Sequence, residues 1–293
     1  MIPEHVMRDL RYIEVYTAKR IRNLRVGQYT SPQRGPGFDF DEHQPYRHGD
    51  DVRRIDWNVT ARMGVPYVRH THAERELNMM IVIDLSRSME LGAAGRSKKE
   101  LMTLITGSLL FSAVADQINA GFLAFSDRVL EYHPPRRTRA AAWQVLERCW
   151  ALSPRPGTTA LLPAVRHLLK VLARMSVVFI VSDFLSDEDL FGGQELAMLA
   201  TKHDVIAVVP EDAAEAALPE GRGYIRVRDL ESGRQAAVSL SPRTRRLYAG
   251  EMRARRDSLT RAFYRAQMDH VFVSTDGSPV EPLLSLFAGR MTR

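Results

Sequence analysis

Four short apolar runs, separated by stretches with helical periodicity, constrain the fold more than any other feature of this chain. They lie at residues 79–83, 118–125, 177–181 and 205–209. An apolar run of this length without charged residues is typical of a strand buried on both faces of a parallel sheet. The alternation of such strands with helices predicts an α/β fold with a doubly wound, mostly parallel sheet.

The residues before and after these runs predict additions to the sheet. Residues 1–77 are expected to hold an N-terminal amphipathic helix and a mixed segment, packed on the core. Residues 78–293 are expected to form the α/β domain, with its core at 78–210. In the C-terminal part, 211–293, a β-hairpin and a long helix are expected to elaborate that core.

Local signals set the ends of some elements. Ser97, with Glu100 three residues later, predicts a capping box at the start of a helix. Pro134 and Pro135 are expected to stop a strand that begins at Val129, because proline cannot donate to a sheet ladder.

The composition is that of an ordinary globular protein with a modest excess of positive charge. Charged residues make up 26% of the chain, the formal net charge is +6 and the pI is near 9.6. This excess is compatible with an acidic partner or a nucleic acid, although acidic residues are mixed throughout. The single cysteine, Cys149, excludes an intramolecular disulfide and is expected to be a buried thiol. No apolar stretch reaches the ~18 residues of a membrane span, so a cytoplasmic location is expected.

Oxygen-bearing side chains follow two of the apolar runs and one turn. Asp84, Ser86 and Ser88 come directly after the first run. Asp183 follows the third run, and Thr158 follows a Pro-Gly turn before a predicted helix. Because the carboxyl ends of parallel strands meet at one edge of a sheet, these side chains are expected to converge. Carboxylates and hydroxyls without sulfur or imidazole suit Mg²⁺ (or Mn²⁺) better than Zn²⁺, and they leave a position that an incoming carboxylate can fill.

The segment at residues 38–64 combines aromatic, acidic and arginine side chains at high density and without a clear period. Its main side chains are Tyr46, Arg47, Asp50, Asp51, Arg53, Asp56, Trp57 and Arg62. One interpretation is a structural clasp in which Trp57 is buried and Arg–Asp pairs fix the loop. The other is a partner-binding surface, since planar arginine side chains suit both.

Three polar residues, His70, His72 and Glu74, alternate along a strand predicted at 65–76. This H-x-H-x-E spacing is compatible with a metal site, but exposed polar residues on an edge strand give the same pattern. Both interpretations stay open at this point.

These motifs resemble those of known families. The D-x-S-x-S motif with a distant Thr and a distant Asp resembles the metal-ion-dependent adhesion site of the von Willebrand factor A domain. The segment F-D-F-D-E-H-Q-P-Y-R-H-G-D-D-V-R-R-I-D-W-N-V-T-A-R resembles the signature of the bacterial family called domain of unknown function 58, in which an A domain follows. The resemblance extends over residues 26–209 and implies a von Willebrand factor A, or Rossmann-like, sheet.

The resemblance also implies roles for the site residues. Ser86 and Ser88 are implied to bind the metal directly. The other implied ligands, Asp84, Thr158 and Asp183, would bind it either directly or through water. Relatives usually read G-G-T-D at the threonine loop, whereas this chain reads P-G-T-T, so Thr159 is an alternative to Thr158.

Members of that family are typically encoded beside a MoxR-type AAA+ ATPase and are thought to assist it in maturing or remodelling client proteins. The resemblance therefore implies a non-catalytic, Mg²⁺-dependent adaptor, whose protein partner supplies an Asp or Glu to the metal.

Other functions remain as alternatives. A Mg²⁺-dependent hydrolase or phosphotransferase would use Asp84 as its nucleophile, but Ser86 stands where such enzymes usually carry a second acid. Arginine-mediated binding of nucleic acid would give an affinity that falls steeply with salt. A purely structural role, in which Asp84, Ser86 and Ser88 cap the following turn, is the third alternative.

Overall fold

The computed structural model describes residues 2–20, 39–48, 50–72, 77–92, 95–152, 159–186, 188–228 and 234–291. The chain forms two compact units. One comprises Met1–Arg25 with Leu77–Arg293, and the other comprises Val26–Glu76.

The first helix belongs to the α/β unit, which corrects its predicted grouping with the segment that follows. Helix α1 (Glu4–Arg20) packs against α3 (Lys98–Ala115). Val6, Leu10 and Ile13 of this helix are buried. Burial of this stripe against a second helix stabilises an amphipathic helix far more than its own propensity does.

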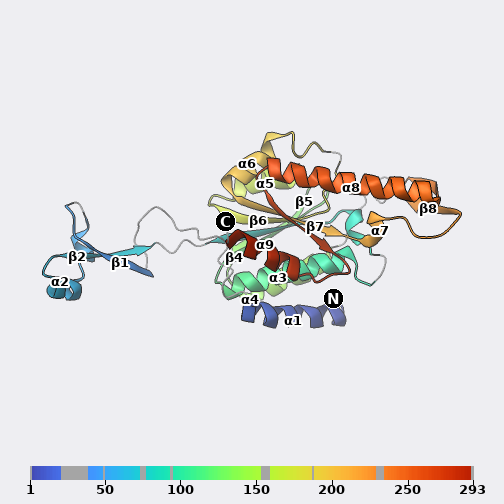
Figure 1. Ribbon diagram of the computed structural model, residues 1–293. Coiled ribbons are helices and arrows are strands. Elements are labelled where there is room, and N and C mark those ends of the chain that lie inside the picture. Colours follow the sequence, from blue (N-terminus) through green and yellow to red (C-terminus); the bar gives the residue numbers. More distant parts are fainter. Residues whose placement is uncertain are drawn as a thin grey trace. The chain divides into compact units, whose positions relative to one another are not determined.

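The α/β unit is built on one sheet, to which the described residues contribute six strands (Figure 1). The strands are β3 (Asn78–Asp84), β4 (Asn119–Phe125), β5 (Val129–Arg136), β6 (Ser176–Val181), β7 (Asp204–Glu211) and β10 (Asp269–Ser274). Their order is β10-β7-β6-β3-β4-β5. All neighbours are parallel except β4 and β5. The predicted doubly wound, mostly parallel sheet is confirmed.

Helices cover both faces of the sheet, as Figure 1 shows. On one face lie α3, α4 (Arg139–Ala151) and α9 (Glu281–Met291); on the other lie α5 (Leu162–Val171), α6 (Gln194–Lys202) and α8 (Pro242–Arg265). No helix within the described ranges is both long enough and apolar enough to cross a membrane.

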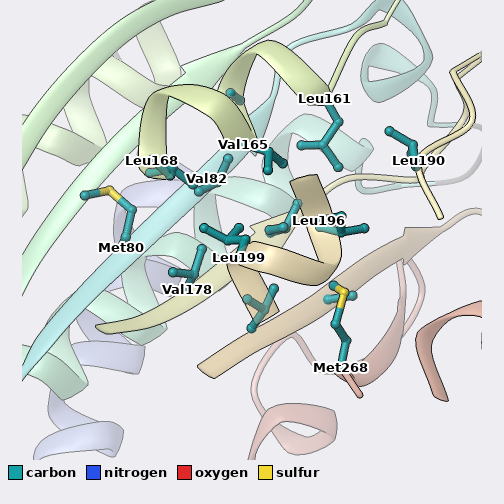
Figure 2. Packing of buried hydrophobic residues seen from close by; sticks show 14 of the residues in the cluster. Met80, Val82, Leu161, Val165, Leu168, Val178, Leu190, Leu196, Leu199 and Met268 are labelled. Carbon is teal, nitrogen blue, oxygen red and sulfur yellow. The ribbon is translucent and has the colours of Figure 1, made fainter. Parts of the chain in front are cut away.

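Alternate residues of the strands pack against the two helical layers. Met80, Val82 and Val178 belong to a buried cluster with side chains of α5 and α6 (Figure 2). Phe179, the next residue on β6, packs edge-on against Phe287 of α9, with ring centroids 6.0 Å apart. Apolar contact on both faces explains why the central strands read as continuous apolar runs.

Strand β5 continues through Pro134 and Pro135 to Arg136, so the prediction that these prolines stop it was wrong. Among the described strands, β5 pairs only with β4 and lies at the edge of the sheet. Proline is tolerated there because an edge strand need not donate on its outer side.

The C-terminal part adds more than a hairpin and a helix. The predicted hairpin is present as β8 (Tyr224–Arg228) and β9 (Gln235–Ser239), and α8 follows it. Strand β10 then pairs in parallel with β7 and extends the sheet. The core of the domain therefore includes residues beyond 210.

The second unit contains a two-stranded antiparallel sheet of β1 (Asp39–Pro45) and β2 (Tyr67–His72). Between them lie a short 3₁₀ helix, Val52–Arg54, and helix α2 (Trp57–Met63). Neither β1 nor α2 was predicted, because the dense mixture of charges and aromatics hides the period of both. The caps of α2 are nevertheless clear in the sequence: Asp56 before it, and Gly64, with a φ of 72°, after it.

A candidate metal site at the edge of the sheet

The site lies where the chain changes direction across the sheet. From β3 the chain passes through α3 to β4 on one side, and β6 later pairs with β3 on the other side. Asp84 is the last residue of β3, and Ser182 and Asp183 directly follow β6. Ligands of open α/β sheets bind at such a switch point, outside the carboxyl ends of the strands.

The loop after β3 holds its polar side chains in a compact cluster. The Oδ1 atom of Asp84 accepts a hydrogen bond of 2.8 Å from the Ser86 backbone N–H. The Oγ atoms of Ser86 and Ser88 lie 2.9 Å apart. Ser86 stands at the N-cap of a 3₁₀ turn, Arg87–Glu90, which turns the Ser88 hydroxyl back toward it. All three side chains are buried.

The second carboxylate comes from the neighbouring strand. The Ser182 Oγ donates a hydrogen bond of 2.6 Å to Asp84 Oδ2, so the ends of β3 and β6 are joined directly. Burial, followed by the nearby negative charge of Asp183, raises the pKa of Asp84 to about 7, against the hydrogen bonds from Ser182 and Ser86. Two carboxylates therefore share this buried region, and it favours a cation.

Sequence reasoning missed one of the charged groups at the site, Lys98. This first residue of α3 is 0% exposed. Its Nζ lies 3.3 Å from Asp183 Oδ2 and 2.6 Å from Oε1 of Glu215, in the short helix α7 (Ala213–Ala216). Nothing in the sequence marks this lysine as buried, because the first turn of a helix usually faces water. Ser182 was also missed, although its place at the end of a buried strand is a usable signal.

The remaining predicted ligand is not placed. Thr158 lies outside the described residues, so its role stays a prediction. Thr159 is buried, and its backbone carbonyl accepts a hydrogen bond of 2.8 Å from Ser186 Oγ.

The donor set fits a hard divalent cation. The structure brings together two carboxylates, Asp84 and Asp183, with the hydroxyls of Ser86 and Ser88, and oxygen donors of this kind are those that Mg²⁺ prefers. Asp84 is a buried carboxylate whose hydrogen-bond donors are uncharged, so a cation would neutralise it. Within the described part of the chain, no three His, Cys, Asp or Glu residues form a metal cluster. The candidate donor set therefore combines two carboxylates with two serine hydroxyls.

The alternative metal motif is not resolved by the structure. Glu74 lies outside the described residues, and the positions of the His70 and His72 side chains are not described either. The H-x-H-x-E hypothesis stays a prediction.

In the signature segment, the carboxylates cap local turns. Asp50 Oδ2 accepts from the Arg47 N–H at 2.8 Å, and Asp51 Oδ1 accepts from the Arg53 N–H at 3.0 Å. These contacts agree with the structural interpretation of the acids.

Asp56 is the best connected acid of that segment. Its Oδ1 caps α2 by accepting from the N–H groups of Asn58 and Val59, and its Oδ2 lies 2.9 Å from His43 Nε2. The hydrogen bond with His43 is the largest cause that lowers the pKa of Asp56, followed by the capping bond from Val59.

Trp57 is 69% exposed, so the prediction that it is buried was wrong. A two-stranded sheet with one short helix has too little apolar surface to enclose an indole. Tyr46 is half-buried and Arg62 is exposed on α2. A binding role for these side chains stays a prediction.

An open α/β sheet with a D-x-S-x-S loop at its switch point defines the class of von Willebrand factor A-like domains. The chain belongs to the family described as "Protein of unknown function DUF58", whose model matches residues 42–258. It is 27% identical over 283 residues to uncharacterised proteins of Mycobacterium bovis and Mycobacterium tuberculosis, and the match covers 96% of this chain and 88% of each relative.

Several solved structures are similar to parts of the chain. An aerotolerance-related membrane protein from Bacteroides fragilis matches 74% of this chain and 100% of that chain, with 14% identity and a TM-score of 0.48. BatB from Bacteroides thetaiotaomicron has the same identity and coverage and a TM-score of 0.46. A von Willebrand factor type A protein from Catenulispora acidiphila matches 75% of this chain and 43% of that chain, with 10% identity and a TM-score of 0.41.

Proposed function

We propose that this protein is a non-catalytic, Mg²⁺-dependent binding module for another protein. The observation that supports this most is the meeting of Asp84, Ser86, Ser88 and Asp183 at the switch point of the sheet. These residues would hold the ion, and the ion would supply an open position with Lewis acidity. A carboxylate of the partner protein would complete its shell, in a charge-assisted contact that excludes partners without an acid there.

The geometry favours binding over catalysis. Both carboxylate oxygens of Asp84 accept hydrogen bonds, from the Ser86 N–H and the Ser182 hydroxyl, which hold it in place rather than activate it. The group two residues on is a serine, so a phosphoaspartyl mechanism would lack its usual general acid. Asp183 forms an ion pair with Lys98, which holds the carboxylate in place. A fixed carboxylate suits a metal ligand better than a nucleophile.

A MoxR-type AAA+ ATPase, or a client of that ATPase, is the partner that we propose. The family membership supports this assignment, because members are typically encoded beside such an ATPase. We also propose that the chain works in the cytoplasm, where such an ATPase would act.

The test is a pull-down of the tagged full-length chain from its native cells. Recovery of the ATPase or a client is compared in Mg²⁺, in chelator, and for the Ser88→Ala variant in Mg²⁺. We expect recovery only with the intact site and the metal. The exposed Ser258 of α8 offers a matched control, because Ser258→Ala makes the same change away from the site.

Equal recovery of the partner under all these conditions would show that the metal site does not take part in the contact. Turnover of a phosphomonoester that depends on Mg²⁺ and disappears in Asp84→Ala would instead make the chain an enzyme.

A further inference from the structure

A cavity of about 380 Å³ lies beside the candidate metal site. It opens to solvent and is lined by the carboxyl ends of β6, β7 and β10 and by α7 and α8, and Asp183 is one of its lining residues. The cavity therefore continues directly from the metal site. Met252 and Leu259 of α8 and Phe272 of β10 make part of its wall apolar. Its volume falls in the range of about 300–1,000 Å³ that is usual for ligand sites.

The acidic side chains of the cavity already have partners. Lys98 is paired with Asp183 and Glu215. Arg256 Nη1 lies 2.9 Å from Oε2 of Glu211. Asp212, the fourth acid, accepts hydrogen bonds from the Ala214 N–H and the Thr275 hydroxyl. Lys98 and Arg256 thus offset two of the four negative charges, and the donors to Asp212 are uncharged.

Two arginines of the same wall keep their charge uncompensated. Arg255 Nη2 donates to the backbone carbonyl of Asp183 at 3.3 Å, and a carbonyl carries no net charge. Arg253 is exposed, and within the described part of the chain it makes no ion pair or hydrogen bond. These two arginines therefore have no acidic partner of their own, and together with Arg256 and Lys98 they balance the four acids of the cavity.

The helix α8 as a whole adds a positive field beside the cavity. The helix carries eight arginines against two acids, Glu251 and Asp257, a net charge of +6. The entire chain has 41 basic and 35 acidic residues, also a net of +6, so the remaining 33 basic and 33 acidic residues balance. The excess charge of the protein is thus concentrated on the helix that forms one wall of the cavity, and it raises the local concentration of anions.

We propose that this cavity binds an acidic segment of the partner protein, with an apolar side chain against Met252, Leu259 and Phe272 and carboxylates on Arg253 and Arg255. The inference rests on the proposed function, because Asp183 belongs to both sites and the segment would flank the acid that reaches the metal. Arginine side chains bind carboxylates through two parallel hydrogen bonds.

A peptide fits this cavity better than a nucleic acid does. The apolar wall suits an aliphatic or aromatic side chain, which a sugar-phosphate backbone does not carry.

The test uses a library of random dodecapeptides displayed on phage and selected on the full-length chain in Mg²⁺. Enriched peptides are synthesised with a fluorescent label, and their affinities are measured by fluorescence polarisation. We expect enriched sequences that combine at least one acidic residue with an apolar residue. Arg253→Glu is expected to weaken their binding about tenfold or more, because a charge-assisted contact is replaced by repulsion.

A matched control lies on the same helix. Arg261 is also exposed and lies outside the cavity, eight residues or about 12 Å along the helix from Arg253. This distance exceeds the screening length of about 8 Å at physiological salt, so Arg261→Glu is expected to leave the affinity within about twofold. A peptide in which lysine replaces the acidic residue is expected to bind the Arg253→Glu variant, because the opposite charges then face each other again.

The outcomes separate this inference from the metal hypothesis. Peptides that lose affinity with Ser88→Ala or chelator but not with Arg253→Glu would overturn the cavity and leave the metal site standing. Peptides that lose affinity with Arg253→Glu but not with Ser88→Ala or chelator would support the cavity and overturn the metal site. Selection of no peptide, or of peptides without acids, would overturn the inference. So would a single-stranded DNA that displaces the peptide in a manner that depends on Arg253.

Discussion

Lys98 is the residue that joins the candidate metal site to the C-terminal helices. Its buried ammonium pairs with Asp183 at the end of β6 and with Glu215 in α7. Despite that pairing, burial raises the pKa of Glu215. Tyr248 of α8 in turn donates a hydrogen bond of 3.0 Å to the Glu215 backbone carbonyl. Lys98 and Tyr248 thus link the sheet edge, through Glu215 of α7, to the helix that forms one wall of the cavity.

We expect Lys98→Met to destabilise the protein by about 3–5 kcal/mol, because it leaves two carboxylates without their buried cation. The measurement is urea unfolding in chelator, followed by circular dichroism. The exposed Lys170 provides the control, since Lys170→Met removes the same charge at the surface and should cost less than about 1 kcal/mol. Equal stability of the Lys98 variant and the wild type would contradict a structural role for the ion pair.

Asp116 gives the protein a specific dependence on pH. It caps the C-terminus of α3, and its buried Oδ2 has no hydrogen-bond partner within the described structure. Burial raises the pKa of Asp116 to about 6, above its ordinary value of 3.8. The folded state therefore binds more protons than the unfolded state between these values, and this residue lowers stability as the pH rises from about 4 to about 6.

We expect Asp116→Asn to be more stable than the wild type at pH 7.5, with a difference that vanishes at pH 4. Asparagine removes the charge without removing the side chain, and a negative charge at a helix C-terminus is unfavourable in itself. The measurement is the difference between the urea midpoints of the two proteins at both pH values. A variant that is less stable at pH 7.5 would show that the carboxylate has a favourable partner.

At the scale of elements, the contact between β4 and the edge strand β5 depends on Gly121. A Cβ atom there would lie 2.9 Å from the His133 backbone oxygen, 2.9 Å from the Pro135 nitrogen and 2.7 Å from Met80 Cε. The first two are backbone atoms that cannot move independently of the sheet. The regular pairing of β4 with β5 is interrupted on both sides of this residue, between Ala120 and Phe122.

We therefore expect Gly121→Ala to destabilise the protein by about 1–3 kcal/mol, as overpacking usually does. Gly250 offers a control of opposite sign, because a Cβ at this position in α8 would meet no atom within 4 Å. Gly250→Ala should stabilise the protein by up to about 1 kcal/mol through helix propensity. Thermal unfolding of both variants measures the difference, and a neutral Gly121→Ala would mean that β5 moves freely away from β4.

At the scale of the whole molecule, binding of a metal at the sheet edge would be linked to global stability. A ligand that binds only the folded state adds about 2.7 kcal/mol to the free energy of unfolding when its concentration is 100 times its Kd. We expect Mg²⁺ to raise the unfolding temperature of the wild type and to leave that of Ser88→Ala nearly unchanged. The measurement is calorimetry with and without chelator, and an equal rise in both proteins would place the ion elsewhere.

The sequence by itself determined the fold class and half of the site. Uncharged apolar runs predict buried parallel strands because only such strands need apolar residues on both faces. The polar residues that directly follow those runs, Asp84 and Asp183, then had to lie at the carboxyl edge. The capping box of Ser97 and Glu100 was also predicted and is present, because it depends on residues three positions apart.

Only the tertiary structure decided which side chains complete the site and where the outer elements lie. Lys98 is buried because residues from β6 and α7, far away in the sequence, converge on it. The position of β5 at the edge permits its prolines, and the pairing of β10 with β7 extends the sheet. Strand order and the burial of a charge depend on distant contacts, which no local pattern of residues records.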